Sequence, residues 1–368
     1  MTDEALSAVV LAAGEGIRMR SARPKPLHRL CGRPLVLHVV DALAELPVGR
    51  TVVVVGHSAE RVAKTLQQQA PPGLMLEVVE QPRPRGTGDA VAVSLTAFPD
   101  EDVDDGGEIV VVPGDTPLLR APTLAALVRS HREADAAATV LTARLDDPTG
   151  YGRIVRSKDG RVHRIVEEAA ATSDERDIDE INTGVYCFRR SLLAPTLRRI
   201  MPDDIDGQIR LTDAIEVLHD AGYTVASMLI DDPMEAAGVN DRAQLAVAEA
   251  ELRDRINERW MRRGVTMLDP ERTYIEAGVR LEQDVTLFPG TFLQGFTTIE
   301  RNCEIGPEVR LVDCTVGEGA VVEYTVAYQA DIGADTVVGP FARLGPGFRL
   351  APGTVTGPFF AGEGAELE

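Results

Sequence analysis

Short apolar runs alternate with amphipathic stretches from Ser7 to about Ile230. The apolar runs are rich in β-branched residues and apolar on both faces, as buried strands of a parallel sheet are. They lie at residues 7–14, 50–57, 74–81, 108–115 and 136–145. Apolar positions at helical spacing occur between them, at residues 35–46, 59–69 and 123–136. This alternation predicts an α/β domain, Rossmann-like in class, with right-handed crossovers between its strands.

Two further elements complete this region. Residues 153–168 have the pattern of a hairpin, with its turn at Asp159-Gly160. Asp241 to Arg263 is a charged stretch without Gly or Pro that ends at Gly264, which predicts a long helix. We therefore expect a catalytic domain at 1–240, a linker helix at 241–264 and a second domain at 265–368.

A different period governs the second domain. From Ile332 an apolar residue followed by a small one recurs every six residues, up to Leu350-Ala351. The signal is strong from Ile299 onward and weaker before it, where the step from Val279 to Val285 is also six residues. A six-residue period is typical of a triangular β-coil, in which each side turns one apolar residue inward. Ordinary hairpins would instead show irregular spacing and a two-residue alternation. We expect a parallel β-helix.

Composition narrows the classes of function. The net charge of −20 argues against nucleic acids and anionic membranes as partners, because both bind basic surfaces. No apolar run is long enough to span a bilayer, and the acidic start does not resemble a secretory signal, so we expect a cytoplasmic protein. The four cysteines lack metal-ligand spacing and are expected to be reduced core thiols: Cys31, Cys187, Cys303 and Cys314.

One segment runs against the acidic balance. No acid occurs between Glu15 and Asp41, whereas five arginines and a lysine do: Arg18, Arg20, Arg23, Lys25, Arg29 and Arg33. This segment directly follows the first strand and the glycines of Gly14-Glu15-Gly16, where backbone N–H groups can face a phosphate. Charge alone fits a solvated loop equally well. Together with the glycines, it points to a site for a polyphosphate.

An ordered set of motifs then resembles one known family. LAAGxGxRM (11–19), PKPLH, GTGDA, GDTPLL, GYGRI, INTGVY and GVNDR follow one another and precede the hexapeptide repeats. This order resembles the bacterial bifunctional N-acetylglucosamine-1-phosphate uridylyltransferase/glucosamine-1-phosphate acetyltransferases, the GlmU family. The resemblance implies a left-handed β-helix that assembles as a homotrimer, and a Mg²⁺-dependent transfer between UTP and N-acetylglucosamine-1-phosphate that supplies UDP-N-acetylglucosamine for peptidoglycan.

The same resemblance assigns residues to roles. Arg18 and Lys25 would stabilise the α-phosphate and the departing pyrophosphate, while Asp115 and Asn240 would bind Mg²⁺. Residues expected to contact substrate are Leu11, Ala12, Ala13, Gly14, Lys25, Gln81, Gly86, Thr87, Gly114, Asp115, Gly152, Glu167, Asn182 and Asn240. Among them Gln81, Gly86 and Thr87 would contact the uracil, and Gly152, Glu167 and Asn182 the acetylated sugar.

Purely structural roles compete with several of these assignments. Asp115 could cap the helix that follows it, and Asn240 could cap the long helix. Without the family, Gly152 would be interpreted as a turn, Glu167 as an exposed strand charge and Asn182 as a loop cap.

The sequence also departs from the family pattern. Ile17 replaces a usual Thr, Pro113 stands where an aromatic residue is common, and GQIRLTDAI (207–215) replaces GEYYLTD. These changes keep two alternatives open: a related enzyme for another sugar-1-phosphate or NTP, and a non-catalytic nucleotide-sugar-binding assembly subunit. The second alternative should lack Arg18, Lys25 or Asp115, and all three are present.

The β-helix departs further. The family's acetyltransferase corner, Arg-Leu-Arg-Pro, is here Arg343-Leu344-Gly345-Pro346, and Gly362-Glu363-Gly364 aligns with a lysine pair. The divergent, Gly-rich C-terminal segment GPFFAGEGAELE (357–368) favours a natural short form over a truncated one. No histidine that could act as the general base follows His219 before the chain ends at Glu368. We expect acetyltransferase activity to be absent.

Overall fold

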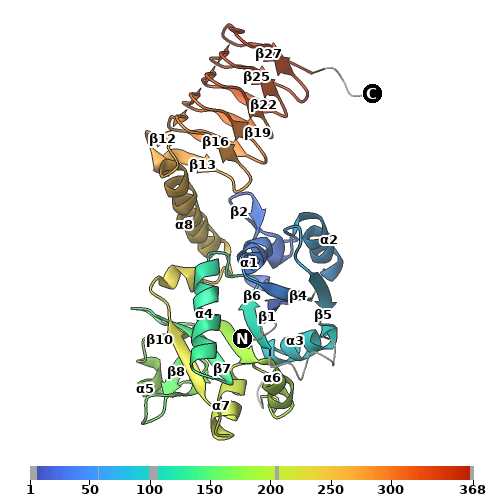
Figure 1. The fold of residues 1–368 in the computed structure, drawn as a ribbon, viewed down its shortest axis with the longest axis vertical. Coiled ribbons are helices and arrows are strands. Elements are labelled where there is room, and N and C mark those ends of the chain that lie inside the picture. The colour runs from blue at the N-terminus through green and yellow to red at the C-terminus, as the bar shows by residue number, and fades with distance from the viewer. Residues whose placement is uncertain (1–5, 57, 99–106, 204–206, 365–368) are drawn as a thin grey trace. The chain divides into compact units, whose positions relative to one another are not determined.

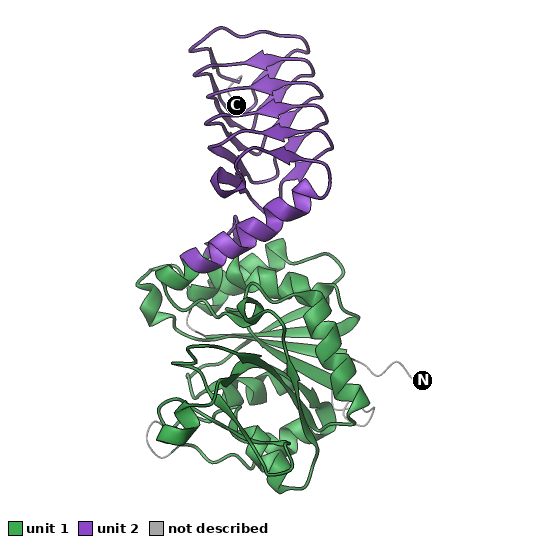
Figure 2. Cartoon of the chain, turned by 90° about the vertical axis from the view of Figure 1, so that its left-hand side faces the viewer, with its two compact units in different colours: residues 1–28, 34–245 green, residues 29–33, 246–368 purple. Residues whose placement is uncertain are grey.

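The computed structural model describes residues 6–56, 58–98, 107–203 and 207–364. The chain divides into two compact units, coloured in Figure 2: unit 1 comprises residues 1–28 and 34–245, and unit 2 comprises residues 29–33 and 246–368. His57, at the end of one predicted strand, and the last four residues of the divergent C-terminal segment lie outside the described residues.

Unit 1 contains a mixed sheet in the order β11-β7-β10-β6-β1-β4-β5. Its strands are β1 (Leu6–Ala12), β4 (Val48–Val55), β5 (Leu76–Glu80), β6 (Glu108–Pro113), β7 (Ala138–Arg144), β10 (Glu180–Arg189) and β11 (Val225–Leu229). β1 lies between β4 and β6 and is parallel to both, whereas β10 runs antiparallel to β6 and β7. The predicted hairpin is present as β8 (Arg153–Arg156) and β9 (Val162–Val166), with β8 paired to β10.

Helices cover both faces of this sheet. They are α1 (Leu35–Ala44), α2 (Ala59–Gln69), α3 (Thr87–Ser94), α4 (Ala121–Glu133), α5 (Ser173–Arg176), α6 (Arg190–Leu197) and α7 (Asp213–Asp220). Val10 of β1 packs in a core with α1, α2 and α4, whereas Val9 packs in a second core with α3, α6 and α7. Because successive side chains of a strand face opposite sides, both must be apolar here, which explains the uninterrupted apolar runs. The predicted α/β fold is confirmed.

Unit 2 contains most of α8 (Arg242–Met261), of which residues 242–245 belong to unit 1, and a stack of short strands (Figure 1). The first parallel sheet comprises β12 (Thr266–Met267), β15 (Thr286–Leu287), β18 (Glu304–Ile305), β21 (Val321–Val322) and β24 (Val337–Val338). The second comprises β13 (Thr273–Ile275), β16 (Thr291–Gln294), β19 (Arg310–Val312), β22 (Val326–Tyr328), β25 (Arg343–Leu344) and β27 (Ala361–Gly362). The third comprises β14 (Arg280–Leu281), β17 (Thr298–Ile299), β20 (Thr315–Val316), β23 (Asp331–Ile332) and β26 (Arg349–Leu350).

These three sheets are the sides of the predicted left-handed parallel β-helix. One apolar side chain per strand is buried inside it, successively Leu281, Leu287, Leu293, Ile299, Ile305, Leu311, Val316, Val322, Ala327, Ile332, Val338, Leu344 and Leu350. The six-residue spacing therefore begins at Ile275, well before Ile299, and three later steps, from Leu311 to Val316 and from Val322 through Ala327 to Ile332, are of five residues. The earlier coils lack a small residue after the inward one, as at Leu287-Phe288, which is why the sequence signal is weaker there.

Membrane-spanning helices and the cysteines were the subject of two further expectations, and both are examined in the described residues alone. No helix among them is long and apolar enough to cross a membrane. All four cysteines are buried and free. Burial raises the pKa of the Cys187 thiol well above its ordinary value, so this group is an unreactive core residue.

Candidate active site

A cavity of about 530 Å³ opens in unit 1 near the carboxyl ends of β1 and β6. That is the edge of an α/β sheet at which ligands bind, and the size suits a nucleotide-sized ligand. The expected substrate-contacting residues that line it are Leu11, Ala12, Ala13, Gly14, Lys25, Gln81, Gly86, Thr87, Gly114, Asp115, Glu167 and Asn182. Arg18, Gly152 and Asn240 are not among its lining residues.

The loop after β1 is shaped around Lys25. Gly16 has φ +65°, and a Cβ built there would lie 2.5 Å from Lys25 Cβ. Any side chain at this position would both strain the backbone and displace the lysine, which explains the second glycine of the motif. The Gly114 N–H donates to Leu11 O at 2.8 Å, which ties the end of β6 to the end of β1.

Lys25, Asp115 and Asn240 converge at this edge. The Lys25 ammonium donates to a carboxylate oxygen of Asp115 and, at 2.7 Å, to Asn240 Oδ1. Their side chains are largely screened from solvent, with Lys25 only 11% exposed and Asp115 27%. A carboxylate oxygen and an amide oxygen thus already face one shared positive charge.

Neither Asp115 nor Asn240 is a helix cap. The next helix after Asp115, α4, has Arg120 at its N-cap and no side-chain cap, so the capping interpretation of Asp115 is wrong. At the start of α8 it is Asp241 whose Oδ1 accepts the Gln244 N–H, at 2.8 Å. The Asn240 side chain is directed to Lys25 instead.

A second part of the cavity is formed by Gln81, Gly86 and Thr87, the last two at the start of α3. Gln81 is buried, and its Nε2 donates to Asp89 Oδ2 at 2.7 Å and to Gly86 O at 3.2 Å. Both amide hydrogens are therefore used within the protein, and its Oε1 is the acceptor that remains. Gly86 has φ +103°, and a Cβ there would meet Ile209 O at 2.4 Å.

The segment from Gln208 to Thr212 packs against the start of α3. Ile209 O accepts the Gly88 N–H at 2.8 Å, and the Leu211 N–H donates to Thr87 Oγ1 at 3.0 Å. This is part of the segment that departs from the family pattern. Four of its residues, Gln208, Arg210, Leu211 and Thr212, line the cavity but were absent from the predicted site. Their only signal in the sequence was that departure.

Glu167 and Asn182 line another part of the cavity, and Gly152 lies beside them. The Asn182 N–H donates to Gly152 O at 2.8 Å, and a Cβ on Gly152 would lie 3.6 Å from Glu167 Oε2. Glu167 is half-buried and accepts from Thr212 Oγ1 at 3.1 Å, so it is not an exposed strand charge. Asn182 lies within β10 rather than in a loop. Tyr186, which was not predicted, also lines the cavity, and burial raises the pKa of its hydroxyl.

Arg18 has a different environment from the other predicted residues. It lies in the short 3₁₀ helix η1 (Ile17–Met19) and is exposed. Ile17 beside it is also exposed, at 77%. Both side chains therefore extend into solvent from the loop that carries Gly16.

The corner of unit 2 that differs from the family pattern, residues 343–346, carries an arginine next to a glutamate. Arg343 in β25 lies 4.0 Å from the carboxylate of Glu363, with both side chains exposed. A Cβ on Gly345 would approach the Glu363 backbone at 3.6 Å. The one arginine retained at this corner thus faces a carboxylate at the position where the resemblance expects lysine.

Comparisons with known proteins agree with this geometry. The MobA-like NTP transferase domain family matches residues 8–208. The chain is 43% identical over 362 residues to the bifunctional protein GlmU of Brevibacillus brevis, covering 98% of this chain and 76% of that protein. It is 47% identical to the bifunctional protein GlmU of Thermobifida fusca, over 88% of this chain and 66% of that protein. The chain is 46% identical to the bifunctional protein GlmU of Mycobacterium marinum, over 95% of this chain and 71% of that protein.

Proposed function

Since the chain belongs to the GlmU family and is a sugar-phosphate nucleotidyltransferase, we propose that it joins UTP and N-acetylglucosamine-1-phosphate into UDP-N-acetylglucosamine. In this reaction a phosphate oxygen of the sugar phosphate attacks the α-phosphorus of UTP, and the bond to the β-phosphate breaks to release pyrophosphate. The convergence of Lys25, Asp115 and Asn240 within the cavity region supports the proposal most strongly. The Lys25 ammonium supplies the positive charge that stabilises a triphosphate, and the two oxygens could bind a metal ion that adds to this charge.

We propose Mg²⁺ as the metal, held by Asp115 and Asn240. Hard oxygen donors suit this ion, and both oxygens already face the single charge of Lys25. When bound, Mg²⁺ would supply positive charge to the triphosphate. Gly16 leaves room for Lys25, since a Cβ there would clash with it, and we propose that the Lys25 ammonium exchanges its two oxygen partners for phosphate oxygens. Arg18, exposed on the same loop, is proposed to close on the leaving pyrophosphate.

The hydrogen bonds of Gln81 favour uracil as the base. Because its N–H groups are bound to Gly86 and Asp89, Gln81 offers an acceptor. Uracil presents an N–H at N3, whereas cytosine presents a lone pair at the same ring position and would leave Gln81 Oε1 unpaired. A buried acceptor without a donor costs about 1–3 kcal/mol, enough to prefer UTP over CTP.

For the acceptor we propose that Glu167, Asn182 and the Gly152 backbone bind the acetamido sugar. They supply a carboxylate, an amide and a carbonyl close together in unit 1, and Thr212 fixes the Glu167 carboxylate. Such neutral and acidic groups pair with sugar hydroxyls and an amide N–H.

A matrix of nucleoside triphosphates against sugar-1-phosphates, measured by pyrophosphate release, tests this proposal. We expect UTP with N-acetylglucosamine-1-phosphate and Mg²⁺ to give the highest kcat/KM. A higher value for another sugar or base would support the related-enzyme alternative. No release with any pair would support a non-catalytic subunit.

We also propose that the chain has no glucosamine-1-phosphate acetyltransferase activity. Its β-helix corner replaces an arginine with Gly345 and opposes Arg343 with Glu363, so a sugar phosphate would meet no excess of positive charge. Thiol release from acetyl-CoA that depends on glucosamine-1-phosphate, above a heat-killed control, would contradict this.

The proposed assembly is a homotrimer through the β-helix. Three exposed aromatic residues, Tyr324, Phe341 and Phe359, stack along it with ring centroids 5.4 and 5.3 Å apart. An exposed apolar row of this kind is typical of an interaction surface. Light scattering at micromolar concentration should give three times the chain mass, and a monomer mass would contradict it.

A further inference from the structure

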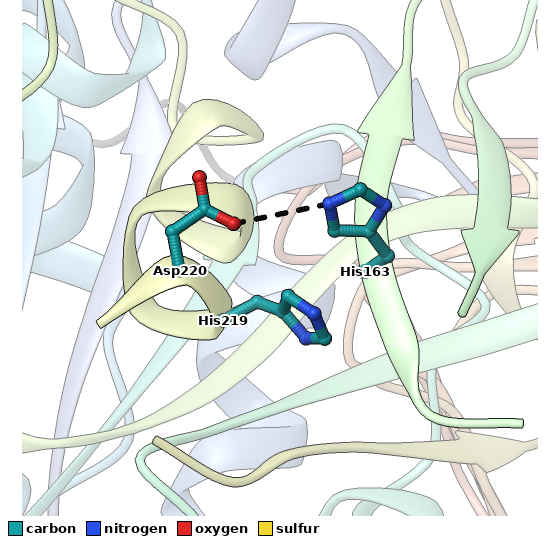
Figure 3. Close-up of side chains that lie close together, drawn as sticks. All are labelled: His163, His219 and Asp220. Carbon is teal, nitrogen blue, oxygen red and sulfur yellow. Dashed lines mark ion pairs between the residues drawn. The ribbon is translucent and has the colours of Figure 1, made fainter. Parts of the chain in front are cut away.

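Two histidines and an aspartate gather in unit 1 on elements that the proposed reaction does not use directly (Figure 3). His163 lies in β9, and His219 and Asp220 form the end of α7. His163 Nε2 is 3.9 Å from Asp220 Oδ1, and the two imidazole centroids are 4.6 Å apart. One potential ligand atom from each residue lies within 4.8 Å of the other two. None of the three lines the active-site cavity.

Their chemistry differs from that of the Asp115–Asn240 pair. Two imidazole nitrogens and one carboxylate form a donor set that suits Zn²⁺ or another late transition metal, whereas Mg²⁺ favours oxygen ligands. In a tetrahedral site with bonds of about 2.0–2.1 Å, ligand atoms lie about 3.3 Å apart. The present separations are somewhat larger. The His163 and Asp220 side chains are 36% and 62% exposed, so rotation of the side chains can bring their ligand atoms together.

The position of this cluster in the fold links it to the acceptor end of the cavity. Glu167 directly follows β9 and Thr212 directly precedes α7, and these two side chains are hydrogen-bonded at 3.1 Å. His163 and the pair His219-Asp220 lie toward the other ends of the same two elements. A metal ion bound by the cluster would therefore join β9 to α7 a second time, opposite the Glu167–Thr212 bond.

We propose that His163, His219 and Asp220 form a Zn²⁺-type site, separate from the catalytic metal, that braces β9 against α7. A bound water completes the coordination. An ion that binds the folded chain alone stabilises it in proportion to the logarithm of one plus the ratio of the free metal concentration to Kd. A free metal concentration of a hundred times Kd raises the unfolding midpoint by on the order of 5 °C. Excess Mg²⁺ does not displace the ion, because the site is rich in imidazole.

The test measures the unfolding midpoint of the full chain with Zn²⁺, in millimolar Mg²⁺, each variant being compared with its own metal-free midpoint. The wild type and the control variant His38→Gln should be stabilised, whereas His163→Ala and His219→Ala should not. With Co²⁺ in place of Zn²⁺, the first two should show the visible absorption of a tetrahedral site and the last two should not. Equal stabilisation of all four proteins, or none in the wild type, would overturn the proposal, and circular dichroism checks that each variant folds.

Discussion

The two units place chemically important side chains by opposite means. In unit 1, Lys25 meets Asp115 and Asn240 from positions 90 and 215 residues away in the chain. In unit 2, neighbouring side chains come from successive coils, as Ile305 pairs with Val322 through adjacent strands. A substitution in the β-helix therefore changes a repeating stack, whereas one in unit 1 changes a unique meeting point.

This difference also shows in the charges. At the edge of the unit 1 sheet one ammonium is hydrogen-bonded to a carboxylate oxygen and to an amide oxygen. At the β-helix corner Arg343 is opposed by Glu363, and both are largely in solvent. Exposed pairs of this kind contribute at most about 1 kcal/mol. Unit 1 thus holds the converging charges of the proposed reaction, whereas the side chains that unit 2 brings together are mainly the buried apolar ones of its stack.

The sharpest test removes the converging charges. Asp115→Ala, Lys25→Ala and Arg18→Ala should each lower kcat by about 10²–10³, because each removes a group that fixes or balances phosphate charge, worth roughly 3–4 kcal/mol. Activity of the wild type should also disappear with EDTA and return with Mg²⁺. Lys64→Ala, on the exposed face of α2, is the matched control and should retain wild-type turnover. Near-normal kinetics in Lys25→Ala and Arg18→Ala would contradict the proposal that these side chains bind the phosphates of the substrate.

A packing defect in unit 2 should lower the stability of the protein and leave its turnover unchanged. Leu311 is fully buried inside the β-helix, so Leu311→Ala should lower the free energy of unfolding by about 2–5 kcal/mol. Turnover of UTP at 25 °C should stay within about twofold of wild type, since no catalytic group is touched. Leu268→Ala, at an exposed leucine of the same unit, is the control and should change stability little. A large loss of kcat in Leu311→Ala would show that the two units are not separable in function.

Acid should weaken unit 1 through a buried histidine. His131 in α4 is 3% exposed, and burial lowers its pKa to about 4, so it is neutral in the folded protein and charges on unfolding. Its contribution is complete above pH 6.5 and is lost as the pH falls toward 4, by on the order of 3 kcal/mol. Denaturant titrations of wild type and His131→Gln at pH 7.5 and pH 4.5 measure this. The wild type should lose more stability than the variant, and parallel losses in both would contradict the assignment.

The smallest expected effect concerns the acceptor end of the cavity. Thr212→Val removes the hydrogen bond to Glu167 while keeping the side-chain shape, at a cost of about 1 kcal/mol. The KM for the sugar phosphate should rise about fivefold, with the KM for UTP unchanged. Thr65→Val in α2, where the Thr65 hydroxyl donates to Arg61 O of the same helix, should change neither value. An equal rise in both KM values would show that Thr212 does not act through the acceptor.

The sequence by itself determined much of the fold. Runs such as 108–115 had to be strands covered on both sides, because their apolar residues face both ways, and β6 is buried accordingly. The six-residue period likewise predicted the β-helix, although the first coils were hidden by residues such as Phe288. Neither β10 nor its antiparallel direction was predicted, since the sequence EINTGVYCFR mixes polar and apolar residues and lacks the uninterrupted apolar run of β6.

Only the tertiary structure decided which candidate residues lie together. Sequence alone left Asp115 and Asn240 as helix caps or metal ligands, because both roles use the same oxygen atoms. The fold places the caps elsewhere, at Arg120 and Asp241, and turns both side chains toward Lys25. The His163–His219–Asp220 cluster could not be found in the sequence, since its members are separated along the chain and approach one another only because β9 packs against α7. Local patterns thus fix which elements form, while the meeting of side chains from distant elements depends on the packing of those elements.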